Sequence, residues 1–165
     1  MTTTKPSKLH IIMGPAACGK STIAEAVSKQ MNWPIIEADD HHPRENVDKM
    51  SKGTPLTDRD RAAWLDSLID AIKTTSSCSV VLACSALTPY VQSRLRDESS
   101  RSCQWWLIDL PRDVLERRIR ARQNHFMPPE LIDSQLASLT PPEDAIRIDG
   151  EQPISKICEE IIARL

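Results

Sequence analysis

The segment GPAACGKS, from Gly14 to Ser21, constrains the fold of this 165-residue chain more than any other. It satisfies the pattern GxxxxGK[ST], in which glycines let the backbone turn tightly around phosphate groups. An apolar run at 9–13 precedes it and predicts a strand, and apolar residues at helical spacing follow it at 23–31. A strand, this loop and a helix in that order predict a phosphate-binding P-loop rather than an ordinary turn with a solvated lysine.

Such a loop binds a nucleoside triphosphate together with Mg²⁺. Backbone N–H groups surround the phosphates, Lys20 spans the β and γ oxygens, and Ser21 holds the metal ion. Ala17 stands where many small-molecule kinases have a further glycine, so we expect a loop without a positive φ at this residue. The predicted nucleotide-binding residues of the loop are Gly14, Pro15, Ala16, Ala17, Cys18, Gly19, Lys20, Ser21 and Thr22.

Strand-like and helix-like segments alternate along the rest of the chain. The later predicted strands cover 34–37, 79–84, 105–110 and 145–148, and the later predicted helices begin at Thr57 and Thr88 or cover 113–122 and 154–165. Alternation of this kind predicts an α/β fold in three layers, with a mostly parallel five-stranded sheet flanked by helices. We expect one domain over 1–165, a flexible N-terminus at 1–7, and a lid at 124–142, which holds four of the twelve prolines.

Charge and cysteine content exclude several classes of protein. The 21 basic and 23 acidic residues give a net charge of -2, so we expect neither nucleic-acid nor membrane binding. Five cysteines without a CxxC pair argue against disulfides or structural zinc and are expected to be small core residues in a reducing compartment. The polar start of the chain does not resemble a signal sequence, so we expect a cytoplasmic protein.

Two acidic residues, Glu37 and Asp39, follow the second predicted strand. In an extended chain both side chains would point the same way at the carboxyl end of the sheet, where ligands of open α/β sheets bind. Asp39 can then accept the proton of an attacking hydroxyl, while Glu37 organises water on Mg²⁺. The alternative is that these acids only solvate a loop. A metal site made from the four consecutive residues 39–42 is disfavoured, because such side chains do not converge on one ion.

Three arginines are candidates for contacts with anions. Arg61 falls on the apolar stripe of the helix predicted to begin at Thr57, so it points toward the sheet and suits a substrate carboxylate or Asp39. A solvated salt bridge with a nearby aspartate is an equally good interpretation of its spacing. Arg118 and Arg122 lie four residues apart before the predicted lid and can stack on a base and clamp phosphates, although isolated arginines are more often surface charges.

Taken together, these residues resemble the gluconokinase family from His10 onward. The segment from His42 to Leu65 matches the family pattern HPxxNxxKMxxGxPLxDxDRxxWL at every fixed position, and further matches are CSAL at 84–87 and HFMPPE at 125–130, with Gln135 and Leu139 beyond. The resemblance implies ATP-dependent phosphorylation of the terminal hydroxyl of D-gluconate to 6-phosphogluconate. It also implies a fold similar to that of shikimate and nucleoside monophosphate kinases.

The resemblance assigns roles to particular residues. It places Asp39 as the base and Glu37 near Mg²⁺ through water, with Lys20 and Arg122 completing the catalytic set. Family members are often dimers, so the resemblance allows a homodimer, although no segment of the sequence identifies an interface. The candidates for contacts with D-gluconate are Asp39, His42, Lys49, Arg61, Ser85 and His125.

The chain also departs from the family. Thr88, Val91 and Gln92 stand where the family usually has lysine and then tyrosine and arginine, and Asn124 replaces a glycine before the HFMPPE segment. These departures leave open a P-loop kinase of another small hydroxy acid or polyol, similar to shikimate kinase. A non-catalytic nucleotide-binding module is the alternative from another class.

Overall fold

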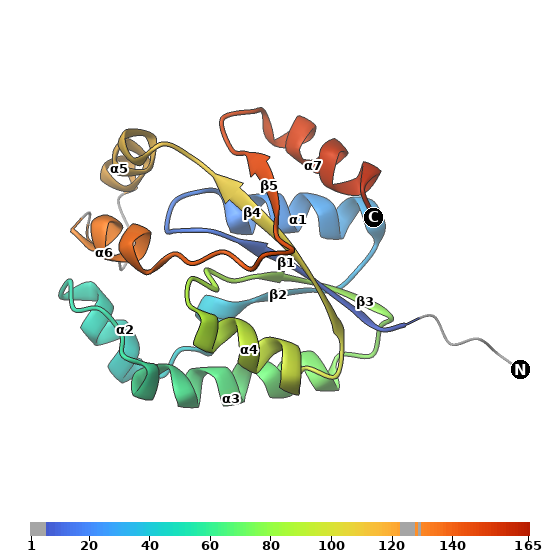
Figure 1. Ribbon diagram of the computed structural model, residues 1–165, viewed down its shortest axis with the longest axis horizontal. Coiled ribbons are helices and arrows are strands. Elements are labelled where there is room, and N and C mark those ends of the chain that lie inside the picture. Colours follow the sequence, from blue (N-terminus) through green and yellow to red (C-terminus); the bar gives the residue numbers. More distant parts are fainter. Residues whose placement is uncertain (1–5, 123–127, 129) are drawn as a thin grey trace, which may run out of the picture.

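The computed structural model describes residues 6–122, 128 and 130–165. These residues form a five-stranded sheet in the order β2-β3-β1-β4-β5, and every pair of neighbouring strands is parallel (Figure 1). The predicted α/β architecture is therefore confirmed, and the sheet is wholly rather than mostly parallel. The strands are β1 (Lys8–Met13), β2 (Ile35–Glu37), β3 (Ser79–Ala83), β4 (Ser102–Asp109) and β5 (Ile146–Asp149).

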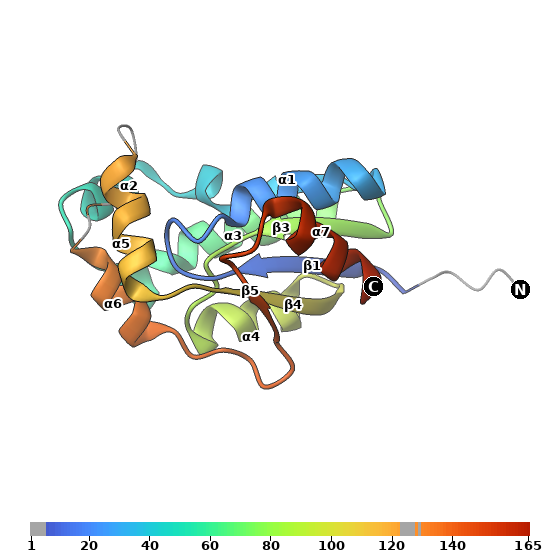
Figure 2. The same ribbon diagram turned by 90° about the horizontal axis from the view of Figure 1, so that it is seen from above.

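Helices cover both faces of the sheet, as Figures 1 and 2 show. The helices α1 (Lys20–Met31) and α7 (Ile154–Ala163) cover one face, and α3 (Asp58–Thr74) and α4 (Pro89–Glu98) cover the other. Successive β1 residues point to opposite layers, so Ile12 packs in the core beneath α1 and α7, and Ile11 in the core beneath α3 and α4. Within the described residues, no helix combines the length and apolar character needed to cross a membrane.

The remaining helical segments gather at the carboxyl end of the strands (Figure 1). They are the 3-10 turn η1 (Ala38–His41), α2 (Arg44–Ser51), α5 (Arg112–Ala121) and α6 (Leu131–Ser138). Of these, η1, α2 and α6 were not predicted, and α6 lies inside the expected lid at 124–142. This end of a parallel sheet is where its loops can surround a ligand.

Local signals explain where two of the helices begin. Thr57 caps α3 and forms a capping box with Asp60, in which each side chain bonds the other residue's backbone N–H. Thr88 caps α4 and Pro89 fills its first turn, as the sequence predicts.

The strand β4 begins three residues before the predicted start at Trp105. Its first residues are mostly polar, but they pair with β1, beginning with Ser102 beside Lys8.

The five cysteines are all free. Cys18, Cys84 and Cys158 are buried and Cys103 is half-buried, which agrees with the expected core role. The expectation is wrong for Cys78, which is exposed because it lies in the turn before β3 rather than within the strand.

His10 is a buried titratable residue within β1. It is 2% exposed, neither ring nitrogen has a hydrogen-bond partner, and its ring stacks on Trp33 with centroids 4.7 Å apart. Burial, and then the charge of Lys8, lowers the pKa of His10 from 6.5 to about 4. Below pH 6.5 the His10 ring therefore binds a proton in the unfolded chain, whereas in the folded chain it stays neutral until the pH falls to about 4.

We therefore expect stability to fall as the pH drops from 6.5 toward 4, with His10 contributing about 3 kcal/mol to that loss. His10→Phe keeps a ring beside Trp33 and should flatten this acid-side slope when urea unfolding is measured at several pH values. His41→Phe, at a partly exposed histidine, is the matched control and should keep the wild-type slope. An unchanged slope in the His10 variant would assign the acid sensitivity to other groups.

Candidate active site

The loop from Gly14 to Ser21 joins β1 to α1 and depends on two glycines. Gly14 has φ 147°, and a Cβ atom there would lie 2.8 Å from Cys18 Sγ and 3.0 Å from the Ile108 carbonyl oxygen. Gly19 has φ 97° immediately before α1. Both positions therefore require a residue without a side chain, which lets the backbone curl closely around an anion at the start of the helix.

Ala17 also has a positive φ, 64°, so the expectation of a loop without positive φ at this residue is wrong. The path of the loop requires the left-handed backbone conformation at position 17, whichever residue occupies it. For an L-residue that conformation costs about 1 to 2 kcal/mol, and alanine presents the smallest side chain that can bear it. The Ala17 methyl group is buried, so the neighbouring core compensates part of that cost.

The first turn of α1 brings a cation and a hydroxyl to the loop. The Lys20 ammonium donates to the Pro15 carbonyl oxygen at 2.9 Å, which folds the side chain back over the loop. The Ser21 hydroxyl donates to Glu37 Oε2 at 2.5 Å. Burial raises the pKa of Glu37, and the nearby Asp39 adds to the rise, against hydrogen bonds from Ser21 and the Asp39 amide and the charge of Lys20.

Ser21 and Glu37 offer two hard oxygen atoms side by side, the kind of donor that Mg²⁺ prefers. Within the part of the chain that the structure describes, no group of three or more His, Cys, Asp and Glu side chains is placed to hold a metal ion. An ion at this position would therefore complete its ligands with phosphate oxygens and water. The residues present fit Mg²⁺ bound together with a triphosphate.

Glu37 and Asp39 do not share one extended strand, and the expectation that they point the same way for that reason is wrong. The strand β2 ends at Glu37, and the chain then turns through the 3-10 segment η1. Glu37 consequently contacts Ser21. Asp39 instead lies farther along the edge of the sheet, between the phosphate loop and a larger cavity.

Two hollows meet at this edge of the sheet. The phosphate hollow is lined by Ala16, Ala17, Gly19, Lys20, Ser21, Thr22, Asp39, Ser85 and Arg122. The main cavity has a volume of about 170 Å³, which suits a small ligand rather than one or two waters. It is lined by Asp39, His42, Met50, Pro55, Leu56, Arg61, Trp64, Ser85, Ala86, Leu87, Thr88, Val91, Leu131, Ser134, Gln135 and Ser138. Asp39 and Ser85 line both hollows, so these two side chains form the boundary between them.

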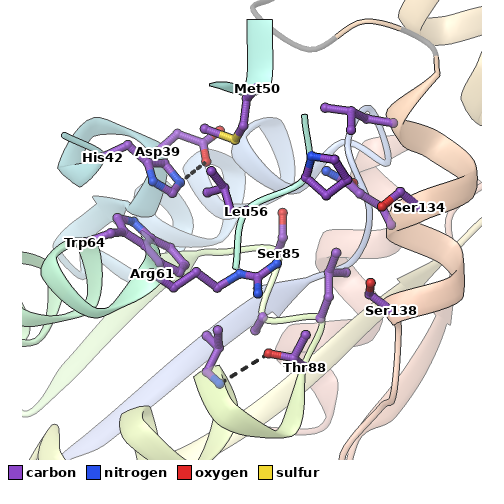
Figure 3. A pocket seen from close by; sticks show the side chains of 16 residues that line it. Asp39, His42, Met50, Leu56, Arg61, Trp64, Ser85, Thr88, Ser134 and Ser138 are labelled. Carbon is purple, nitrogen blue, oxygen red and sulfur yellow. Dashed lines mark hydrogen bonds and ion pairs between the residues drawn. The ribbon is translucent and has the colours of Figure 1, made fainter. Parts of the chain in front are cut away.

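Arg61 extends from α3 into the main cavity, which Ser85 also lines (Figure 3). Its Nη1 is also 3.2 Å from Asp58 Oδ1, so the salt bridge and the position facing the cavity occur together. Among the described residues that line the cavity, Arg61 is the sole arginine or lysine. It is therefore the natural partner for an anionic group bound there.

Four hydroxyl groups also line the main cavity, among apolar side chains such as Leu56 and Leu131. Ser85 and Thr88 come from the segment between β3 and α4, and Ser134 and Ser138 come from α6 on the opposite side (Figure 3). A small polar molecule with several hydroxyls would find donors and acceptors on two sides. Ser134 and Ser138 were missed in the sequence because α6 was not predicted, although their spacing of four residues is a helical signal.

Lys49 is not among the residues that line the main cavity. Its ammonium lies 2.7 Å from Asp60 Oδ1, and the pKa of Asp60 falls to about 2, first through the hydrogen bond from Lys49 and then through the Thr57 amide. In this arrangement Lys49 fastens α2 to the start of α3. Its predicted contact with the substrate therefore stays a prediction that the geometry does not support.

The two arginines before the expected lid both approach the phosphate loop. Arg118 on α5 places Nη1 3.5 Å from the Cys18 carbonyl oxygen. Arg122 lines the phosphate hollow, but it follows the last residue of α5 and has extended backbone, φ -84° and ψ 117°. Helical spacing therefore does not relate the two, and the chain turning away after α5 is what brings Arg122 over the hollow.

Gln135 connects α6 with the phosphate loop, a role the sequence did not reveal. Its Oε1 accepts a hydrogen bond from the Ala16 amide at 2.7 Å. Gln135 had appeared only as a match to a family pattern, since a polar residue in an unpredicted helix carries no signal of its own. Two other predicted positions, His125 and Asn124, lie outside the described residues.

The residues that depart from the family pattern have clear structural roles. Thr88 caps α4 and, with Val91, lines the main cavity. Gln92 is buried, and its Nε2 donates to the Ala86 carbonyl oxygen at 2.9 Å and to that of Thr140 at 2.8 Å. Gln92 thus joins the loop after β3 to the segment after α6, and so holds together two walls of the cavity.

Comparison with known proteins gives matches along most of the chain. A family model described as an AAA domain matches residues 9–142. A gluconokinase of Gluconobacter oxydans (strain 621H) is 38% identical over 159 residues, which cover 92% of this chain and 88% of that protein.

Two solved structures are also similar. The crystal structure of a sugar kinase from Janibacter sp. HTCC2649 matches with a TM-score of 0.88 and 34% identity, covering 96% of this chain and 94% of that one. The crystal structure of a gluconokinase from Sinorhizobium meliloti 1021 matches with a TM-score of 0.82 and 34% identity, covering 96% of this chain and 90% of that one.

Proposed function

Since this chain belongs to the gluconokinase family, we propose that it transfers the γ-phosphoryl group of ATP to the terminal hydroxyl of D-gluconate, giving 6-phosphogluconate. One observation supports this function above the others. The phosphate hollow and the main cavity share Asp39 and Ser85, so a donor in the first and an acceptor in the second would meet at a carboxylate. Such a meeting point is what direct transfer between two bound substrates requires.

The acceptor cavity matches the chemistry of a sugar acid. Arg61 supplies the cation for a carboxylate, and Ser85, Thr88, Ser134 and Ser138 supply hydroxyls for a polyol chain. With the carboxylate near Arg61, the far end of the molecule extends toward Asp39 and the phosphate hollow. We therefore propose Arg61 as the group that orients the substrate so that its terminal hydroxyl is presented for reaction.

In the proposed step the hydroxyl oxygen forms a bond to the γ-phosphorus while the bond to the β–γ bridging oxygen breaks, and the hydroxyl proton passes to Asp39. Lys20, Arg118 and Arg122 surround the phosphates and compensate their charge. Ser21, with Glu37 through water, would hold Mg²⁺, which when bound supplies further charge neutralisation. A cytoplasmic location and a homodimer stay predictions from the sequence and its resemblance.

Arg61→Ala should weaken use of gluconate far more than use of ATP. Loss of a charged hydrogen-bonding group from a half-enclosed site predicts a rise in the KM for gluconate of roughly 10- to 100-fold, with the KM for ATP within about twofold of wild type. Steady-state kinetics with each substrate varied in turn measures both values. Arg59→Ala, an exposed arginine on the same helix, is the matched control and should behave as wild type. A larger change in the KM for ATP would move Arg61 to the nucleotide.

A coupled assay of ADP release tests the proposed function directly. The acceptors are D-gluconate, other aldonates, shikimate and a nucleoside monophosphate, each with ATP and Mg²⁺. Release that depends on gluconate and exceeds release with every other acceptor supports the proposal. Preference for another acceptor would reassign the substrate, and bound ATP without release for any acceptor would indicate a non-catalytic nucleotide-binding module.

A further inference from the structure

Asn46 on α2 is 3% exposed and bridges two groups beside the proposed base. Its side-chain nitrogen Nδ2 lies 2.8 Å from the Asp60 carbonyl oxygen and 3.3 Å from His42 Nδ1. The position of this amide in the site is therefore set from two directions, by the backbone of α3 and by a histidine ring.

The bond to Asp60 decides which way the Asn46 amide faces. A backbone carbonyl oxygen can only accept a hydrogen bond, so the Asn46 atom next to it is the nitrogen, which carries two hydrogens. The second hydrogen is then available to His42 Nδ1, which must accept it. A neutral imidazole that accepts at Nδ1 carries its own proton on Nε2.

The orientation of the His42 ring is fixed as well. The ring stacks on Trp64, with centroids 4.5 Å apart and planes 12° apart, and the indole of Trp64 donates to the Ala38 carbonyl oxygen at 2.8 Å. With one face on Trp64 and Nδ1 on Asn46, Nε2 lies 4.0 Å from Asp39 Oδ1 (Figure 3). The His42 side chain is 6% exposed and that of Asp39 is 43% exposed, so the acid has more room to turn toward the ring.

We propose that Asn46 is a positioning residue that holds His42 as the Nε2–H tautomer, so that His42 donates toward the Asp39 carboxylate. The kinetic part of this inference rests on the proposed function, in which Asp39 accepts the proton of the substrate hydroxyl. A donor on one carboxylate oxygen keeps the other oriented for that proton, as a fixed tautomer does in other acid–base sites. With the opposite tautomer a lone pair of His42 would face the carboxylate and repel it.

The charges around His42 agree with a neutral ring. Burial lowers the pKa of His42, Asp39 raises it, and Arg61 and His41 lower it further. These groups come from η1 and α3, the elements on either side of the ring. Near neutral pH the His42 ring is therefore uncharged. It carries a single proton, and the neighbours of the ring decide whether that proton is on Nδ1 or on Nε2.

The tautomer can be observed without any activity. Long-range ¹H–¹⁵N NMR of the wild-type protein labelled with ¹⁵N separates protonated from unprotonated ring nitrogens for each of the four histidines. The signals of His42 are those lost in His42→Phe, which keeps a ring on Trp64. We expect a bare Nδ1 and a protonated Nε2. A proton on Nδ1 in the wild-type protein would overturn the proposal, whether or not the protein phosphorylates gluconate.

Asn46→Asp tests the consequence for catalysis. An ionised aspartate can only accept at this position, so His42 Nδ1 should gain a proton. The ring then either loses the Nε2 proton and turns a lone pair toward Asp39, or becomes an imidazolium whose charge makes Asp39 a weaker base. We expect kcat to fall roughly 10- to 100-fold with the KM for ATP unchanged, together with the altered NMR pattern. Ser67→Ala, which removes the partner of the neighbouring His41 at 3.1 Å, is the matched control and should keep wild-type kcat. A proton on His42 Nδ1 together with normal kcat would overturn the positioning role.

Discussion

Replacing Lys20 by methionine is expected to abolish turnover. The substitution keeps most of the length of the side chain but removes the ammonium that now lies 2.9 Å from the Pro15 carbonyl oxygen, within the phosphate hollow. In the proposed reaction that charge follows the γ-phosphoryl group as it leaves the β-phosphate. Removing one preorganised cation from such a transition state predicts a loss in kcat of roughly 10³-fold or more.

The measurement is ADP release at saturating ATP and gluconate, with the melting temperature as a check on folding. Lys29→Met lies in the same helix, is exposed, and changes the same charge far from the hollow. It should retain wild-type kcat and a similar melting temperature. If the Lys20 variant kept more than about a tenth of wild-type kcat, the loop would not act on the transferred group, and the P-loop assignment would fail.

Asp39→Asn should lower kcat by roughly 10²- to 10⁴-fold while ATP still binds. The amide preserves the shape of the side chain at the boundary of the two hollows but can no longer accept a proton. In the proposed site the remaining nucleotide contacts come from the P-loop, Arg118 and Arg122, which this substitution does not alter. A loss in kcat without a loss in ATP affinity is therefore the signature of the missing base.

The nucleotide affinity of this variant is measured by titration, and kcat by single-turnover kinetics so that product release does not mask the chemical step. Asp40→Asn makes the same change one residue along η1, at an exposed side chain outside both hollows, and should leave kcat unaltered. Near-normal kcat in the Asp39 variant would exclude it as the base. Equal losses in both variants would point to the net charge of η1 instead.

The layers of the fold were predictable because they depend on patterns within single segments. A continuous apolar run such as 79–83 fits a strand buried on both faces, and the threonine before α3 and α4 marks each start. The short helices at the edge of the sheet were not predicted, because they depend on contacts with other elements rather than on a pattern within one segment. Most side chains of α2 are polar or charged, and the helix buries only Asn46 and Met50, so contacts with other elements, and not its own pattern, hold it in place.

The residues of the candidate site also differ in whether their positions depend on neighbouring or on distant parts of the sequence. Lys20 and Ser21 line the phosphate hollow, and that placement could be predicted because it follows from the covalent spacing within one loop. Glu37 and Asp39 were assigned to one strand, but β2 is three residues long and ends at Glu37, which spacing along the sequence does not reveal. Lys49 and Gln135 depend on partners 11 and 119 residues away, so their contacts appear only when the chain is folded.

The shared wall of the two hollows has a thermodynamic consequence. A ligand that reorients Asp39 or Ser85 in one hollow changes the surface offered to the ligand in the other, so their binding free energies are coupled. Such coupling is reciprocal: whatever factor a bound nucleotide applies to the dissociation constant of the sugar acid, the sugar acid applies to that of the nucleotide. Titrating each ligand in the presence and absence of the other closes this cycle, and its size measures how far the two sites act as one.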